Sequence, residues 1–309
     1  MTLPRQFRRP RIGLIGFGDV ARRLLMARLA TPGASHGPIW ITVSRSGLGH
    51  FSAEERQRLR SARVKGLTWN LDHRQTARRL AGTLTHQIIL SPPAESGQTD
   101  QRMRSVSHAL RAVHRPVPGV YLSTTGVYGN HHGRTVSEVS HCQPTQPRSL
   151  RRLDAENSLR HSSGFHVLRV PGIYAHDRLP LARLHAKQPA LNAEDDVFTN
   201  HIHADDLARI AWLALFRGRP ARVTNAVDQT QLKMADYFDA VADAVSLPRP
   251  PRISKAEMQA LGKTGAVNPM MMSFLSESRH VTTQRLTKEL RVTLRYPTVH
   301  DTLRTLKKG

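Results

Sequence analysis

The chain is poor in cysteine, in aromatic residues and in long apolar runs. Its 309 residues include one cysteine, Cys142, which excludes an internal disulfide and a zinc site built on several cysteines. Aromatic residues make up 5%, too few for a surface on which nucleic-acid bases stack. No apolar run approaches the roughly 20 residues that cross a bilayer. The first residues lack the apolar stretch of a secretory signal, so we expect a cytoplasmic protein without a membrane segment.

Acidic residues are also scarce. There are 23 of them against 46 lysines and arginines, which leaves a net charge of +23. Such a charge attracts polyanions, either a phosphate-bearing cofactor or a nucleic acid. The basic residues are scattered over many expected helices rather than gathered in one tail, which favours solvated helix faces over nucleic-acid binding. Nucleic-acid association stays open as a third hypothesis, which salt-dependent binding to duplex DNA would test.

Short apolar runs alternate with segments of helical periodicity over the first 170 residues or so. This order is typical of βαβ units and predicts an α/β fold with a Rossmann-type, doubly wound parallel sheet. A capping box of Ser52 and Glu55 marks the start of one of the helices. The expected strands cover residues 12–15, 39–43, 64–69, 87–90, 119–123 and 165–170, and the expected helices cover 19–29, 101–113 and 149–160 and begin near 52 and 74.

The order loosens after residue 170, where Pro180 and Pro189 interrupt the pattern. We expect a strand at 197–202, a helix at 205–215 capped by Asp205 or Asp206, and a strand at 222–227. Later helices are expected at 234–245, after the capping box of Ser254 and Glu257, and from Asn268 and Pro269. The sequence thus predicts a nucleotide-binding core over 1–176, to which 197–228 returns, and a smaller mixed substrate-binding cap over 177–309, all in one integrated unit.

A G-x-G-x-x-A motif lies between the first expected strand and the first expected helix. Gly16 permits the tight turn out of the strand, Gly18 lets the backbone approach a diphosphate, and Ala21 lets the helix pack on the strand. The helix N-terminus then offers N–H groups and positive potential to the anion. The segment predicts a dinucleotide site whose contacts also include Asp19 and Val20.

The end of the second expected strand indicates which dinucleotide binds. NAD sites place an acid there for the ribose 2′-hydroxyl, whereas NADP sites favour an arginine nearby. This chain has Ser44, Arg45 and Ser46 after Val43, and no acid. We therefore predict NADP as the cofactor, with NAD as the other possibility.

Four further segments resemble the extended-to-atypical branch of the short-chain dehydrogenases/reductases, the NAD-dependent epimerase/dehydratase group with G-x-G-x-x-A in its first turn. The segment 121–129, YLSTTGVYG, is similar to the signature of the fifth strand, and 169–174, RVPGIY, is similar to the sixth-strand segment that faces the nicotinamide. The segment 201–208, HIHADDLA, resembles an I-H-x-x-D-L-A element, and Tyr296 and Pro297 also fit. The resemblance covers nearly the whole chain.

The resemblance implies roles for residues at the ends of the expected strands. Asn70 and Leu71 would lie by the adenine, and Thr124 matches the catalytic Ser/Thr that hydrogen-bonds the substrate oxygen. The remaining coenzyme contacts would come from Ser91, Pro92, Pro93, Ser123, Pro171 and Ile173.

The chain departs from the catalytic motif of that family. The family uses Y-x-x-x-K, in which the tyrosine is the general acid/base and the lysine lowers its pKa and holds the ribose. None of the five tyrosines here has a lysine four residues on, and Arg148 and Arg152 stand at the motif spacing. A guanidinium does not release a proton near neutral pH, so Arg148 cannot replace the phenol. Arg152 could still contact the ribose, and Tyr128 is the candidate for acid/base chemistry.

Two functions follow from these observations. The first is an NAD(P)-binding oxidoreductase or epimerase that acts on a carbonyl or alcohol of a small anionic molecule, such as a nucleotide sugar. The alternative is a non-catalytic NADP(H)-sensing protein that keeps the coenzyme site and has lost the catalytic pair. No metal site is predicted, because His201 and His203 have no third ligand at a suitable spacing. The sequence leaves the oligomeric state open.

Overall fold

The computed structural model describes residues 10–31, 39–43, 51–62, 64–68, 70–112 and 117–306. The chain forms two compact units that are assembled from interleaved segments. Unit 1 comprises Met1–Thr124, Pro147–Arg169 and Leu207–Thr224, and unit 2 comprises Thr125–Gln146, Val170–Asp206 and Asn225–Gly309.

Unit 1 is built on a seven-stranded sheet with the order β12-β7-β5-β4-β1-β2-β3. Adjacent strands pair in parallel at β1–β2, β1–β4, β2–β3 and β4–β5, and the order reverses between β1 and β4. The predicted doubly wound α/β sheet is confirmed. The strands are β1 (Ile12–Ile15), β2 (Ile39–Val43), β3 (Lys65–Thr68), β4 (His86–Ile89), β5 (Gly119–Thr124), β7 (His166–Val170) and β12 (Val223–Asn225).

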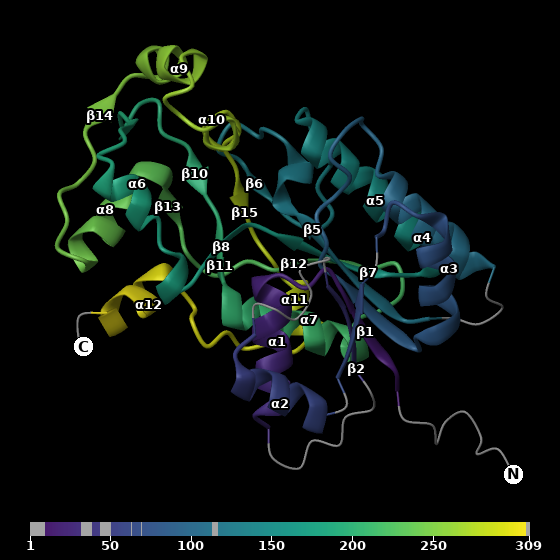
Figure 1. Ribbon diagram of the computed structural model, residues 1–309. Helices are drawn as coiled ribbons and strands as arrows, with labels where there is room; N and C mark the ends of the chain where they lie inside the picture. Colours follow the sequence, from purple (N-terminus) through teal and green to yellow (C-terminus); the bar gives the residue numbers. More distant parts are fainter. Residues whose placement is uncertain are drawn as a thin grey trace, which may run out of the picture. The chain divides into compact units, whose positions relative to one another are not determined.

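Helices cover both faces of this sheet (Figure 1). On one face α4 packs between α3 and α5, and their apolar side chains form one core with those of β1, β4 and β5. On the other face α1 and α7 meet, and the Arg28 guanidinium lies 4.7 Å from the Trp212 ring centroid. The helices are α1 (Asp19–Leu29), α2 (Ala53–Ser61), α3 (Arg74–Thr83), α4 (Gln101–Arg111), α5 (Pro147–Ser163) and α7 (Ala204–Arg217).

Unit 2 combines short two-stranded sheets with short helices. The pairs β11–β8, β14–β9 and β15–β6 are parallel and β10–β13 is antiparallel. The strands are β6 (Thr135–Val136), β8 (Gly172–Tyr174), β9 (Ala190–Leu191), β10 (Phe198–Thr199), β11 (His201–His203), β13 (Leu232–Lys233), β14 (Arg252–Ile253) and β15 (His280–Val281). The helices are α6 (Leu181–His185), α8 (Met234–Ala244), α9 (Lys255–Lys263), α10 (Pro269–Leu275), α11 (Arg285–Lys288) and α12 (Val299–Leu306), with 3₁₀ turns at Thr125–Tyr128 and His176–Arg178.

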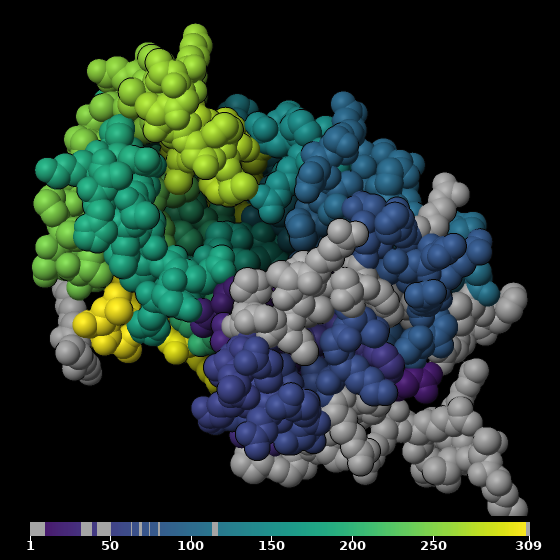
Figure 2. All heavy atoms as spheres, in the orientation of Figure 1, coloured from purple at the N-terminus to yellow at the C-terminus, as the bar shows by residue number. Residues whose placement is uncertain are grey.

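Three local capping signals predicted helix starts correctly. Both predicted capping boxes are present. The hydroxyls of Ser52 and Ser254 each accept from the backbone N–H three residues on, and the backbone N–H of each serine donates to the carboxylate of the glutamate at that position. Asn268 caps α10 with Pro269 at its first turn. Within unit 2, α9 and α10 lie at the surface (Figure 2), and Met270 and Phe274 of α10 are exposed. Capping side chains act within one turn of the chain, which is why these three helix starts could be predicted from the sequence.

Two predictions in the segment 197–206 were wrong. The expected single strand at 197–202 is interrupted at Asn200, because β10 pairs with β13 whereas β11 pairs with β8. The helix expected to be capped by Asp205 or Asp206 begins at Ala204, so both acids lie in its first turn. The backbone N–H of Asp205 donates instead to Nδ1 of His203, at 3.2 Å. A buried imidazole therefore takes the capping position, which the sequence rules assign to a carboxylate or a hydroxyl.

Within the described residues no helix is long and apolar enough to span a bilayer.

Candidate functional site

The turn from β1 into α1 requires glycine at Gly16. Its φ of +89° lies in the left-handed region, and a Cβ there would come within 2.4 Å of the backbone nitrogen of Ser91. The backbone N–H of Ser91 donates to the carbonyl of Ile15 at 3.1 Å, which holds the first residue after β4 against this turn. The glycine at this position is thus demanded by the protein's own packing.

Gly18 is different, because nothing in the fold requires a glycine there. Its φ of −95° suits any residue, and a Cβ would meet no atom within 4 Å among the described residues. Gly18 is the N-cap of α1 and has no side chain to cap the helix. The absent side chain leaves open space beside the first N–H groups of an 11-residue helix. A diphosphate needs this geometry in order to approach the backbone.

The rest of the motif packs as expected for a strand–turn–helix unit. Ala21 is fully buried and Val20 nearly so, which fits the close approach of α1 to the sheet. The carboxylate of Asp19 accepts from Nε of Arg23 at 3.0 Å through each of its oxygens. This ion pair offsets the negative charge that Asp19 would otherwise place beside a bound anion.

The predicted contacts after β3 and β4 lie at the carboxyl edge of the sheet. Asn70 forms an Asx turn by accepting from the N–H of Asp72 at 2.9 Å, and Leu71 packs against the core. Ser91 and Pro93 are buried and Pro92 is exposed, and the Ser91 hydroxyl has no partner among the described residues. Their coenzyme contacts stay predictions. The predicted ribose-binding residues Ser44, Arg45 and Ser46 lie outside the described residues.

A buried ion pair lies below the end of β5, and the sequence analysis missed it. Glu156 of α5 accepts from Arg169 of β7 at 2.8 and 3.2 Å, and the two side chains are 0% and 4% exposed. The hydroxyl of Ser123, one of the expected coenzyme contacts, donates to the same carboxylate at 2.5 Å. The available signal was an arginine inside a mostly apolar strand, because a buried charge requires a counter-charge.

Arg152 is also buried, and it ties the ends of two strands together. Its Nη1 donates to the carbonyls of Ser91 and Leu122, at 3.1 and 3.0 Å, and to the hydroxyl of Tyr121 at 2.8 Å. Burial raises the pKa of Tyr121 to about 12, so this phenol stays protonated at neutral pH. Arg152 thus fixes β4 beside β5 at the carboxyl edge of the sheet, where ligands of doubly wound folds bind.

Two more arginines lie in the first turns of α5. Nη1 of Arg151 donates to the carbonyl of Gly97 at 2.5 Å, and its Nε is buried without a partner among the described residues. Desolvation and the positive charges of Arg152 and Arg151 lower the pKa of the Arg148 guanidinium. Cations at a helix N-terminus are unfavourable for the helix itself, so their gathering here favours an anionic ligand.

The remaining predicted site residues are distributed over both units. Thr124 ends β5 in unit 1 and is half-buried. Tyr128 in unit 2 is fully buried, and its hydroxyl donates to Oδ1 of Asn225 at 2.7 Å. Proton transfer by this phenol would require it to leave Asn225. Pro171 and Ile173, also in unit 2, are half-buried.

Unit 2 contains a buried polar cluster that the sequence analysis did not identify. Desolvation raises the pKa of Asp228 to about 7, although its carboxylate accepts from the N–H of Thr230 at 2.9 Å. Burial lowers the pKa of His201 to about 3, and burial followed by the charge of Asp228 raises the pKa of Tyr174. The His201 ring lies edge-on to Tyr174, with centroids 5.9 Å apart. The signal lay in two segments, HIH and VDQT, whose proximity no local pattern reveals.

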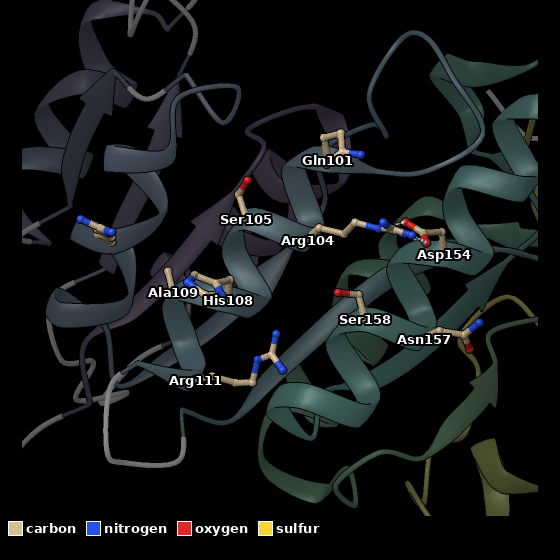
Figure 3. A pocket seen from close by; sticks show the side chains of 10 residues that line it. Gln101, Arg104, Ser105, His108, Ala109, Arg111, Asp154, Asn157 and Ser158 are labelled. Atoms are coloured by element: carbon tan, nitrogen blue, oxygen red, sulfur yellow. Dashed lines mark hydrogen bonds and ion pairs between the residues drawn. The ribbon is translucent and has the colours of Figure 1, made fainter.

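A hollow of about 620 Å³ lies on the outer faces of α3, α4 and α5. An ion pair crosses it, because Arg104 of α4 reaches Asp154 of α5 at 2.5 Å (Figure 3). Its walls come from helix surfaces and not from strand ends, so we place the coenzyme site elsewhere. The other lining residues are Arg78, Gln101, Ser105, His108, Ala109, Arg111, Asn157 and Ser158.

In the described part of the chain, no three histidine, cysteine, aspartate or glutamate side chains gather in a way that could hold a metal ion.

Comparison with known proteins connects this architecture to nicotinamide enzymes. No family model and no curated protein matches the sequence. A conserved protein of unknown function from Silicibacter pomeroyi DSS is 26% identical, with a TM-score of 0.74 over 97% of this chain and 98% of the other. A protein assigned as an NAD-dependent epimerase/dehydratase from Methylobacillus flagellatus is 20% identical, with a TM-score of 0.70 over 97% and 98%.

The dTDP-glucose 4,6-dehydratase of Streptomyces venezuelae, determined as a double mutant with NAD bound, is 14% identical, with a TM-score of 0.72 over 96% and 95% of the two chains. These likenesses extend over both units and over nearly the full length of each chain. The protein therefore has the fold of the extended short-chain dehydrogenases/reductases, which is the fold of the NAD-dependent epimerases and dehydratases.

Proposed function

We propose that the protein binds a nicotinamide dinucleotide on unit 1 and oxidises, reduces or epimerises a small molecule that carries an alcohol or a carbonyl. The glycine turn at Gly16 and Gly18, the order reversal between β1 and β4, and the fold it shares with a dTDP-glucose 4,6-dehydratase support this proposal. That likeness also makes a nucleotide sugar a candidate substrate. A bound coenzyme would supply the hydride acceptor or donor.

The open space at Gly18 carries the proposal. We expect Gly18→Ala to cost no more than about 1 kcal/mol of unfolding free energy, because the new methyl group meets no described atom and alanine is only a poorer N-cap than glycine. The same change should weaken coenzyme binding at least tenfold, about 1.4 kcal/mol. Titration of NADPH and NADH, followed by fluorescence and by thermal shift, measures both effects.

Gly82→Ala in α3 is the matched control, since a Cβ there also meets no atom of the described residues within 4 Å. This variant should change the unfolding free energy by no more than about 1 kcal/mol and should leave coenzyme affinity unchanged. A wild-type protein that binds neither coenzyme at millimolar concentration would refute the proposed function.

We further propose that the coenzyme is NADP, because Arg45, Ser44 and Ser46 offer cationic and hydroxyl contacts to a 2′-phosphate. Replacing Arg45 by Ala should weaken the binding of NADPH at least tenfold and change the affinity for NADH by no more than about threefold. Arg58→Ala on the exposed face of α2 serves as the control. A tenfold preference of the wild type for NADH would contradict the assignment.

We further propose that Tyr128 is the proton-transfer residue and that Thr124 hydrogen-bonds the substrate oxygen. The arginines at 148 and 152 support a second candidate, a non-catalytic NADP(H)-sensing protein, because neither can act as the general acid. Turnover of a panel of carbonyl compounds and nucleotide sugars, followed by the absorbance of the reduced nicotinamide, distinguishes the enzyme from the sensor. Turnover that falls in Thr124→Val supports the enzyme, whereas coenzyme binding without turnover supports the sensor.

A further inference from the structure

The guanidinium of Arg152 uses one of its three nitrogens. Its three hydrogen bonds all come from Nη1, to the carbonyls of Ser91 and Leu122 and to the hydroxyl of Tyr121. Nε and Nη2 donate to no atom of the described residues. These two nitrogens form the side-on fork of an arginine, whose parallel N–H groups match the two oxygens of a carboxylate. The side chain is 7% exposed, so its position is set by the surrounding protein.

The charge of Arg152 also lacks a carboxylate in contact with it. All three acceptors of its hydrogen bonds are uncharged, and no ion pair to it occurs among the described residues. Asp100 acts on it only at longer range, and desolvation raises the pKa of that carboxyl. Arg151 beside it also donates to a neutral carbonyl. Buried charges are normally paired, so this pair of arginines favours an anion that the described residues do not supply.

The position of Arg152 indicates which ligand brings that anion. Ser91 packs against Gly16 at the first turn, and Leu122 lies on β5, two strands from β1 in the sheet. A dinucleotide that crosses the order reversal places its diphosphate over Gly16 and Gly18, and its second half over β4 and β5. The nicotinamide half carries no negative group beyond that diphosphate. A second anion at Arg152 must therefore come from the substrate.

We propose that Arg152 binds a carboxylate of the substrate through Nε and Nη2, and that the protein acts on alcohols or carbonyls of organic acids. The inference rests on the proposed function, since it places the acid beside the coenzyme. Arg148 lies one turn earlier on the same face of α5 and adds a second positive charge. The substrate class is thus a hydroxy acid, an oxo acid or a sugar acid.

Two pairs of probes test the inference on the full-length protein saturated with its coenzyme. Oxamate is compared with neutral oxamide, and glucuronate with glucose, by calorimetric titration and thermal shift. We expect each acid to bind at least tenfold more tightly than its neutral counterpart. Inorganic phosphate is titrated alongside, and a preference for phosphate over both acids would overturn the assignment of a carboxylate.

Two variants locate the site. Arg152→Gln should weaken the binding of both acids at least tenfold and change coenzyme affinity by less than threefold. Arg152→Lys keeps the charge and the fold but not the fork of two N–H groups, and it should weaken the binding of both acids at least threefold. Arg160→Gln is the matched control, because this residue lies two turns further along α5 and donates to the carbonyl of Ala221.

The outcomes separate this inference from the proposed function. A flat coenzyme titration of the wild type contradicts the proposed function. Coenzyme binding without any preference for the acids, or with acid affinity unchanged in Arg152→Lys, contradicts the carboxylate site alone. If Arg152→Gln or Arg152→Lys lost coenzyme and acid affinity equally, Arg152 would be a coenzyme contact and the inference would be wrong.

Discussion

Glu156 shows how a single buried acid supports the edge of the sheet. Its carboxylate accepts hydrogen bonds from both Arg169 and Ser123, so Glu156→Gln would remove the charge that pairs with the guanidinium of Arg169 at 4% exposure. We expect a loss of about 3–5 kcal/mol of unfolding free energy, measured by urea denaturation. Arg104→Gln, which breaks the partly exposed pair with Asp154, should cost less than about 1 kcal/mol. Equal losses in the two variants would contradict this account.

Asp228 makes the stability of unit 2 depend on pH. Its folded pKa of about 7 lies above the ordinary aspartate pKa of 3.8, so between these values the folded state binds more protons than the unfolded state. The free energy that the protonated carboxyl contributes to folding is therefore fully present below about pH 4, and it is lost as the pH rises through 7.

Asp228→Asn should remove this dependence and stabilise the protein above pH 7, on the order of 2–4 kcal/mol. The unfolding free energies of the two proteins, measured from pH 4 to pH 9, give the difference directly. Titration of His201 cancels in that difference, because both proteins contain it. An unchanged difference across the range would show that Asp228 ionises normally.

At the scale of elements, the first turn of α7 anchors a distant loop. Asp206 is fully buried and accepts from the backbone N–H groups of Arg295 and Tyr296 at 2.8 and 2.9 Å. Asp206→Ala should cost about 2–4 kcal/mol, because two buried donors lose a charged acceptor. Asp205→Ala is the adjacent control, since its side chain is 41% exposed, and should cost less than about 1 kcal/mol. Differential scanning calorimetry distinguishes the two.

Elements whose signals are local were predictable from the sequence. The bounds of β1, α1 and β2 agree with the predicted ranges, because apolar periodicity and flanking glycines act within a few residues. The strand expected at 197–202 failed at Asn200, whose amide carbonyl accepts from the N–H of Val281. Pairing with two different partners is a long-range event, and no window of the sequence contains it.

At the scale of the whole molecule, the charge of +23 opposes compaction. Added salt screens this repulsion, so the melting temperature of the coenzyme-free protein should rise by about 2–4 °C between roughly 50 and 500 mM NaCl. Thermal melts in NaCl and in sucrose separate screening from preferential exclusion, because the sugar carries no charge. A melting temperature that falls with salt would show that ion pairs outweigh the repulsion.

The glycine turn between β1 and α1 was predictable from the G-x-G-x-x-A motif, because the positive φ of Gly16 is a local requirement, whereas the contact of Gly16 with Ser91 was not. The roles of Arg152, Glu156 and Tyr128 were not, since each depends on a partner more than ten residues away. The sequence predicted Tyr128 as an acid/base and Ser123 as a coenzyme contact. The structure gives both hydroxyls buried partners, and their catalytic and binding roles stay predictions.

The sequence by itself determined the strand and helix order of unit 1, the capping box of α2 and the glycine turn, because these follow from periodicity and from local steric limits. Tertiary structure alone decided which segments join each unit, where Asn200 breaks a strand, and which charges are buried together. It also decided that Arg152 turns one nitrogen toward the protein and leaves two without a partner among the described residues. The physical reason is that burial and ion pairing are properties of the packed chain, which residues far apart in the sequence create together.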